Sequence, residues 1–218
     1  MTLPGFEYPH QLQSECWQER ACRQALTAIQ ARPDGITLAM PDVGAYFACL
    51  ASYNSGTLHG AWVDLELISD VDDLQDCIDW ILSTSPAPDA EEWAMHDSSG
   101  LPDCLSRSEW PDLEQLADYG AALSELSRFE WEPFCICCND RGEVVDVEDF
   151  RDCYSGTYDS CTDFAYQLSE NVGVMPDGLM PWPLTCIDWE QAWRDLQISG
   201  EYSADAASSG GVHIFRSF

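Results

Sequence analysis

The stretch VGAYFACLASYNSGTLHGAWVDLELISDVDDLQDCIDWIL, residues 43–82, decides the fold because it predicts two strands followed by a helix. Residues 45–50 are apolar and strand-like, residues 52–56 have the composition of a turn, and residues 59–67 alternate as a second strand does. Residues 70–82 predict a helix with acids in its first turn, where they suit the helix dipole. Its inner apolar stripe is Leu74, Ile78, Ile81 and Leu82.

The rest of the chain predicts further small units on both sides of this stretch. A short strand at residues 92–96 closes the first unit. Helical spacing recurs at residues 16–32, 110–129, 144–154, 159–172 and 187–196, with a loop at 176–183 and a terminal strand at 212–215. We therefore expect an α+β protein with a helical extension and three small domains in a row. Their bounds are 1–40 for the extension, 43–106 for an N-terminal α+β domain, 107–143 for a central helical domain and 144–218 for a C-terminal α+β domain.

The charge balance excludes several classes of partner. The chain has 39 acidic and nine basic residues, all nine of them arginine, and a net charge of −30. Nucleic acid and anionic membranes both require basic surface, so neither is an expected partner. No apolar run approaches the roughly 18 residues of a spanning helix, and residues 1–13 lack the features of a secretory signal. These observations favour a cytoplasmic protein, and nine tryptophans indicate a folded core rather than disorder.

The residue types that commonly act in catalysis or metal binding do not form a recognisable catalytic or metal site. Eleven cysteines without a secretion signal indicate mostly buried, reduced thiols. Residues 135–138, Cys-Ile-Cys-Cys, have CxxC spacing, but zinc requires a second such pair or two nearby histidines. The acids that begin the helix at residue 70 lack the glycine and glutamate of a calcium loop, and the four histidines are scattered. We expect no catalytic, cofactor-binding or metal-binding residues, and no enzyme.

The acidic surface itself is the strongest functional signal. Residues 1–40 carry a net charge of −1 and residues 41–218 carry −29. Solubility or adaptation to high salt is one interpretation, although the many large aromatic residues weaken it. The other is imitation of a polyanion: at one charge per 1.7 Å, a charge of −29 matches about 50 Å of duplex DNA, roughly 15 base pairs. The carboxylates expected to form this surface are Asp70, Asp72, Asp73, Asp76, Asp79, Glu114, Asp118, Glu125, Asp146, Glu148, Asp149, Asp152, Asp159, Asp163 and Glu170.

Several separated motifs resemble those of the ArdA antirestriction proteins. They are YNSGTLHGAWVDL at 53–65, EEWAMHD at 91–97, FRDCYSGTYDS at 150–160, IDWE at 187–190 with RDL at 194–196, SGEY at 199–202 and GVHIF at 211–215. The motifs keep their order over about residues 45–216. The resemblance implies an elongated three-domain protein that pairs through its C-terminal domain and is carried by mobile genetic elements as an anti-defence factor.

The resemblance further implies that such a dimer imitates bent duplex DNA and occupies the DNA groove of type I restriction-modification enzymes, without cofactor or catalysis. An acidic interaction protein with another basic DNA-binding partner is the alternative. Two features depart from the family pattern: the nearly neutral segment 1–40, and the cysteine cluster at 135–138, whose metal or redox role stays open.

A homodimer is also expected. The DNA bound by the methyltransferase core of a restriction enzyme is longer than the duplex that the charge of one chain can imitate. Two bodies of this charge repel each other, so their contact must be apolar. The candidates, within residues 144–185, are Phe150, Tyr154, Tyr158 and Trp182. The alternative is that these four side chains fill the core of the C-terminal domain.

Overall fold

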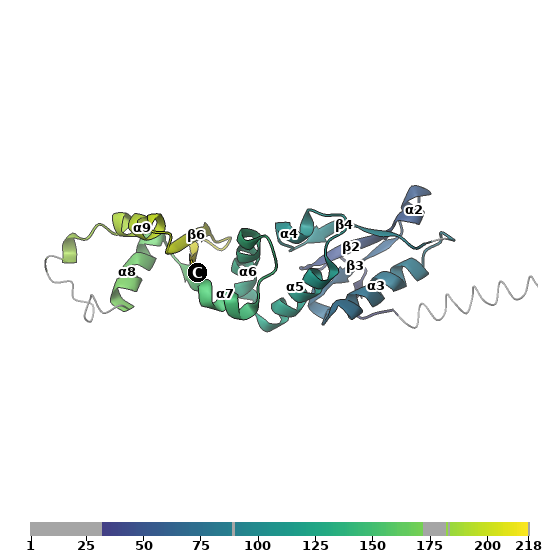
Figure 1. Ribbon diagram of the computed structural model, residues 1–218, viewed down its shortest axis with the longest axis horizontal. Helices are drawn as coiled ribbons and strands as arrows, with labels where there is room; N and C mark the ends of the chain where they lie inside the picture. Colours follow the sequence, from purple (N-terminus) through teal and green to yellow (C-terminus); the bar gives the residue numbers. More distant parts are fainter. Residues whose placement is uncertain (1–31, 89, 172–181, 183, 218) are drawn as a thin grey trace, which may run out of the picture. The chain divides into compact units, whose positions relative to one another are not determined.

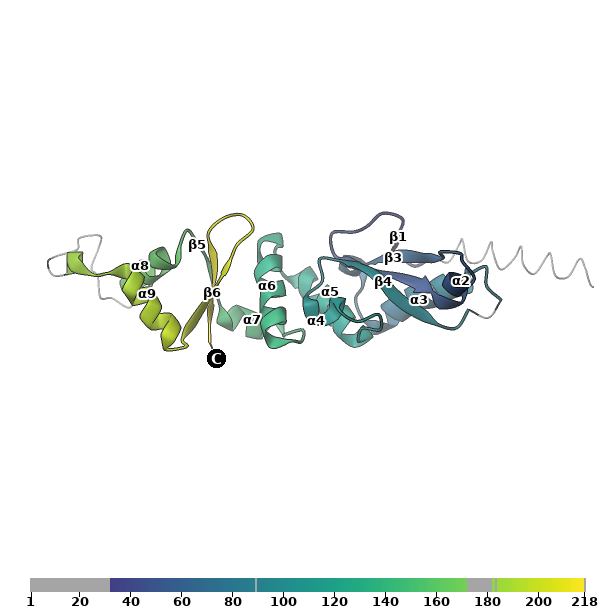
Figure 2. The same ribbon diagram turned by 90° about the horizontal axis from the view of Figure 1, so that it is seen from above.

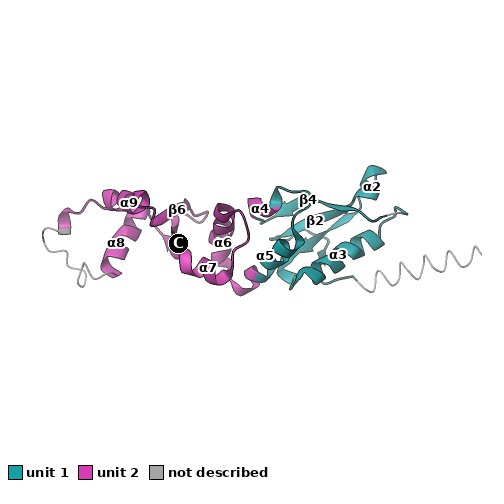
Figure 3. Ribbon diagram, viewed as in Figure 1, with its two compact units in different colours: residues 1–101, 106–121 teal, residues 102–105, 122–218 magenta. Residues whose placement is uncertain are grey.

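The structure is a computed structural model that describes residues 32–88, 90–171, 182 and 184–217 (Figure 1). Its described residues form helices and two antiparallel sheets, which confirms the α+β class. The chain divides into two compact units (Figure 3). Unit 1 comprises residues 1–101 and 106–121, and unit 2 comprises 102–105 and 122–218. The expected division into three domains, with its bounds, stays a prediction.

Unit 1 is built on a four-stranded antiparallel sheet with the order β1-β3-β2-β4. Its strands are β1 (Ile36–Thr37), β2 (Gly44–Cys49), β3 (Gly60–Asp64) and β4 (Trp93–Ser99). The helix α3 (Val71–Ser83) packs against β2 and β3, as Figure 2 shows. Its buried side chains are Leu74, Cys77, Ile78 and Ile81, so the predicted stripe is correct except that Leu82 is half-buried and Cys77 is added.

Two local predictions in unit 1 are wrong. The segment 52–56 is not a loop throughout, because residues Leu50–Asn54 form the short helix α2, which ends before Gly56. The predicted strand at 59–67 stops at Asp64, since the Asp64 side chain accepts a hydrogen bond from Glu66 N at 3.0 Å and starts the 3-10 turn η1 (Leu65–Leu67). The side chain thus replaces the backbone partner that a continuing strand would need.

The helix predicted over 110–129 corresponds to α5 (Leu113–Glu125), and a second helix, α6 (Arg128–Arg141), begins just before the predicted end. Glu130 Oε2 accepts hydrogen bonds from Ser127 N at 2.9 Å and Ser127 Oγ at 2.7 Å, which starts a new helix at that point. The apolar stretch 134–138 lies inside α6, and Gly142, with φ +75°, ends it. The short helix α4 (Asp103–Ser106) precedes both.

Unit 2 contains a three-stranded antiparallel sheet with the order β5-β7-β6. The strands are β5 (Tyr154–Tyr158), β6 (Tyr202–Ala206) and β7 (Val212–Arg216). Besides α6, the helical elements of this unit include α7 (Val147–Cys153), α8 (Cys161–Asn171), η2 (Leu184–Cys186) and α9 (Trp189–Ile198). Phe164 and Ala165 of α8, Trp193 of α9 and Ile214 of β7 form one buried cluster.

A second aromatic cluster fixes the junction between α6, α7 and β5. Phe150 is 0% exposed, meets the Phe134 ring edge-on at 5.3 Å and stacks on Tyr154 at 5.1 Å. Aromatic rings from three elements therefore pack against one another inside unit 2.

Some expectations fall on residues outside the described part of the chain. Residues 1–31 of the extension lie there, as do all but the last residue of its helix at 16–32 and most of the loop at 176–183.

Candidate functional site: the exposed carboxylates

The fifteen carboxylates expected to form an acidic surface all reach solvent. Thirteen of them are exposed, Asp163 and Glu170 are half-buried, and none is buried. They lie on or beside the helices α3, α5, α7 and α8. The structure therefore places them in groups by helix, and every member of each group is wholly or partly exposed to water.

The densest group follows α3, and we call Asp70, Asp72, Asp73, Asp76 and Asp79 the α3 row. At 1.5 Å of rise per residue the row is about 13 Å long, so its five charges are spaced at about 3.4 Å along the axis. One strand of B-DNA carries one charge per about 3.4 Å of axis. Projected on the helix axis, whichever side of the helix each charge lies on, the α3 row therefore has the linear charge density of a single DNA strand.

Hydrogen bonds at the start of α3 hold part of this row in place. Asp70 Oδ1 accepts from Asp73 N at 3.0 Å, and Asp73 Oδ2 accepts from Ser69 N at 3.1 Å. Both carboxylates thus satisfy backbone donors at the helix N-terminus, where the helix dipole also favours negative charge. Asp72, Asp76 and Asp79 lie on the opposite side from the buried stripe and are exposed.

Glutamine amides orient carboxylates on three helices without cancelling their charge. Gln75 Nε2 donates to Asp79 Oδ1 at 2.7 Å on α3, and Gln167 Nε2 donates to Asp163 Oδ2 at 2.9 Å on α8. Gln191 Nε2 donates to Asp195 Oδ1 at 2.8 Å on α9. A lysine at these spacings would also pair with the acid but would neutralise it. The three pairs therefore keep the carboxylates both ordered and charged.

A second dense group follows α7, and we call Asp146, Glu148, Asp149 and Asp152 the α7 row. All four are exposed, and the same rise per residue gives about 3 Å between charges. Arg151 of this helix donates from its guanidinium to the carbonyl oxygen of Glu125 at 3.2 Å. The α7 row again matches the charge spacing of a DNA strand.

Helix caps contribute further exposed acids besides the fifteen expected from the sequence. Asp112 Oδ1 accepts from Glu114 N at 2.9 Å at the start of α5, and Asp188 Oδ1 accepts from Gln191 N at 3.1 Å at the start of α9. An acid directly before a helical pattern is a recognisable cap in the sequence, so this signal was available.

The acidic residues are divided evenly between the two units. Unit 1 has 20 acidic and four basic residues, and unit 2 has 19 acidic and five basic residues.

The carboxylate of Glu132 connects two elements of unit 2. Its carboxylate accepts hydrogen bonds from Ser208 N and Ser208 Oγ, both at 2.8 Å, and lies 3.4 Å from Nε2 of the buried His213. Burial works to raise the pKa of Glu132, but the bonds from Ser208 and the neighbouring His213 outweigh it and lower that pKa. Glu132 thereby joins α6 to the turn between β6 and β7.

The cysteines give no metal site within the described ranges, where no three His, Cys, Asp or Glu side chains could share an ion. Instead, Cys137 Sγ lies 3.8 Å from Cys153 Sγ, a pair from two different helices. The histidines are separate: His59 Nε2 contacts Ile81 O at 2.8 Å, His96 packs on Tyr53, and His213 is buried. His10 lies outside the described residues.

The four side chains proposed for self-contact differ in exposure. Phe150 is fully buried, so it has no surface to offer and instead fills the core, which corrects its place among the interface candidates. Tyr154 and Tyr158 are half-buried, and Tyr158 Oη donates to Ser155 O at 3.0 Å. Trp182 is 82% exposed and is the strongest remaining candidate.

Comparison with known proteins gives one clear match. The sequence model of the family described as antirestriction protein (ArdA) matches residues 45–208. No curated protein matches the chain. Within the described residues, no helix is long and apolar enough to cross a membrane.

Proposed function

Because this chain belongs to the ArdA family of antirestriction proteins, we propose that it inhibits type I restriction-modification enzymes by imitating duplex DNA and occupying their DNA-binding groove. The inhibition requires binding alone, without catalysis or a cofactor. The observation that supports the mechanism most strongly is the α3 row, whose charge spacing of about 3.4 Å equals that of one DNA strand.

The physical basis is the exchange of phosphates for carboxylates in a basic groove. A groove built for DNA presents arginine and lysine side chains at the spacing of phosphates. Each exposed carboxylate contributes little, but a surface of many produces a field that steers and holds a basic partner. The acids are distributed over both units, so each can contribute to the contact.

Two copies act together in this proposal, because the negative charge of one chain equals that of only about 15 base pairs of duplex DNA. A two-fold pair is the commonest closed assembly. The contact includes Trp182, since its exposed indole supplies the apolar area that must offset the repulsion. Sedimentation at micromolar protein, with Trp182→Glu as the variant, tests this part. A monomeric wild type that still inhibits would overturn it.

Six substitutions in the two rows test the charge mechanism. Asp72, Asp76 and Asp79 on α3 and Glu148, Asp149 and Asp152 on α7 are changed to their amides, which leaves the helix-start acids Asp70, Asp73 and Asp146 intact. At about 0.5 kcal/mol each, the six changes cost roughly 3 kcal/mol, or about 100-fold in the inhibitory concentration.

The matched control exchanges Asp for Glu, and Glu for Asp, at the same six positions, so that the charge is kept. We expect this control to inhibit within a few-fold of wild type and the six-amide variant to be far weaker. Circular dichroism verifies that both variants remain folded. An equally potent, folded six-amide variant would show that the rows are not the contact surface.

A further inference from the structure

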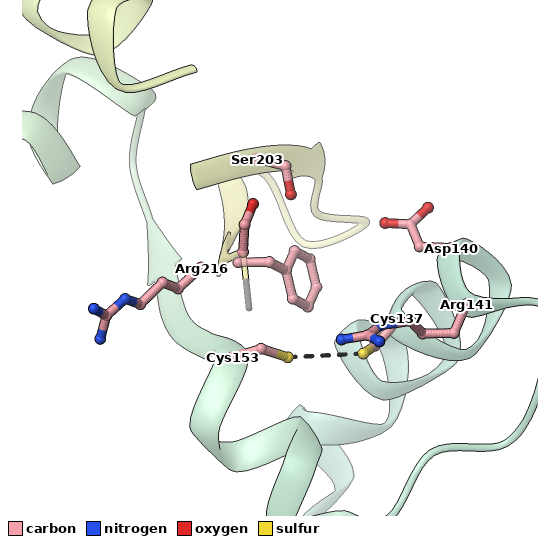
Figure 4. A pocket seen from close by; sticks show the side chains of 8 residues that line it. Cys137, Asp140, Arg141, Cys153, Ser203 and Arg216 are labelled. Carbon is pink, nitrogen blue, oxygen red and sulfur yellow. Dashed lines mark hydrogen bonds between the residues drawn. The ribbon is translucent and has the colours of Figure 1, made fainter. Parts of the chain in front are cut away.

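A pocket in unit 2 gives solvent access to two buried thiols. It encloses about 320 Å³ and is lined by Cys137 of α6 and Cys153 at the end of α7, together with residues of β6 and β7 (Figure 4). The two side chains are only 6% and 4% exposed, yet their sulfur atoms lie 3.8 Å apart (Figure 4). A small molecule that enters the pocket therefore lies against both cysteine residues.

The two thiols have different chemical surroundings. Burial raises the pKa of Cys137 to about 12. Burial also raises the pKa of Cys153, and the charge of Arg141 counteracts burial at both thiols, but the contact between the two sulfurs lowers the pKa of Cys153 and raises that of Cys137. The Cys153 thiol donates a hydrogen bond to Phe150 O at 3.2 Å. Because the thiolate is the reactive form, Cys153 is the better first nucleophile of the pair.

We propose that Cys137 and Cys153 are an oxidative modification site, at which a small peroxide converts the two thiols into a reversible disulfide. This inference is independent of the proposed antirestriction function. It rests on the shared pocket and on the sulfur–sulfur distance, since two cysteines with sulfurs already in contact need only small side-chain rotations to reach bonding distance, about 2.05 Å.

The reaction balances with hydrogen peroxide as the oxidant. The Cys153 thiolate attacks one peroxide oxygen, the O–O bond breaks, and the leaving hydroxide takes up the thiol proton to become water. The sulfenic acid that forms on Cys153 is then attacked by the Cys137 sulfur, the S–O bond breaks, and a second water leaves with the Cys137 proton. Two thiols lose two electrons and two protons, and one peroxide becomes two waters.

The disulfide would join the middle of α6 to the end of α7 and close a loop between residues 16 apart in sequence. A cross-link of that length restricts the unfolded chain, so the oxidised protein melts at a higher temperature, by roughly 5 °C. The α7 row lies within the closed segment, and its helix is therefore anchored at its last residue.

The test uses the full chain, fully reduced, exposed to hydrogen peroxide, and then alkylated before digestion and mass spectrometry. We expect a linked peptide pair that contains Cys137 and Cys153, a loss of two hydrogens from the intact mass, and reversal of both by dithiothreitol. The raised melting temperature should return to its reduced value in the same step.

Cys77→Ser is the matched control. Cys77 is also buried, has a pKa raised by burial to about 12, and lines a pocket in unit 1 whose described lining includes no second cysteine. This variant should form the same linkage as wild type, whereas Cys153→Ser and Cys153→Ala should not. Linkage of Cys137 to Cys135, Cys138 or Cys161 at a similar yield, or no linkage in the wild type, would overturn the proposal.

Discussion

Replacement of Phe150 by alanine tests the aromatic cluster at the centre of unit 2. The Phe150 side chain is fully buried between the Phe134 and Tyr154 rings, at centroid distances of 5.3 and 5.1 Å. Removal of a buried phenylalanine ring costs about 3–5 kcal/mol, because apolar burial is lost and a cavity remains. For a chain of this size that loss lowers the melting temperature by on the order of 10 °C.

Phe129→Ala is the matched control, since Phe129 lies on α6 but is 91% exposed. We expect it to change the free energy of unfolding by less than about 0.5 kcal/mol. Urea unfolding followed by circular dichroism measures both variants, and sedimentation of each reports self-association. A folded Phe150→Ala protein of wild-type stability that loses self-association would refute the core assignment and return Phe150 to the surface.

Three further results are expected from single substitutions. Asp118→Asn should leave inhibition of a type I enzyme within about two-fold of wild type, because one exposed charge contributes well under 1 kcal/mol; a complete loss in a folded variant would reveal a discrete site instead. Gly120→Ala should lower the urea midpoint although alanine favours helices, since the added Cβ would lie 2.4 Å from the carbonyl oxygen of Leu65; a higher midpoint would contradict this packing. Glu132 has a lowered pKa in the folded state, so its bonds with Ser208 stabilise at neutral pH, and that contribution disappears as the pH falls through the lowered pKa. Glu132→Gln should therefore be less stable than wild type at pH 7, with the difference closing below about pH 4, and a gap that widens in acid would reverse the assignment.

A helix whose apolar stripe extends over several turns could be predicted from the sequence, whereas short strands that form by pairing with a distant strand could not. The helix α3 was predicted within one residue at each end, because its stripe and its acidic cap give two agreeing signals. The strands β5 and β6 were missed, since their sequences YSGTY and YSADA lack alternating large apolar residues. Both strands form because they pair with β7, and such long-range pairing leaves no local pattern.

The candidate site shows the same division. Exposure of the acids was predictable, because charged residues opposite an apolar helix stripe face water. The burial of Phe150 was not, since its contacts come from Phe134 and Tyr154 on separate elements. The proximity of Cys137 to Cys153 also depends on how α6 and α7 pack. The CxxC spacing in the sequence involves Cys135 and Cys138 and does not indicate this contact.

The most direct test of DNA mimicry is competition for a purified type I methyltransferase that holds a fluorescent duplex containing its target sequence. If this protein occupies the DNA groove, it should displace the duplex completely, and its apparent Kd should rise in proportion to the DNA concentration. The binding should also weaken steeply as salt rises, because the contact is made by charges that compete with counterions. A stable complex of enzyme, duplex and this protein, formed without loss of bound DNA, would contradict the account.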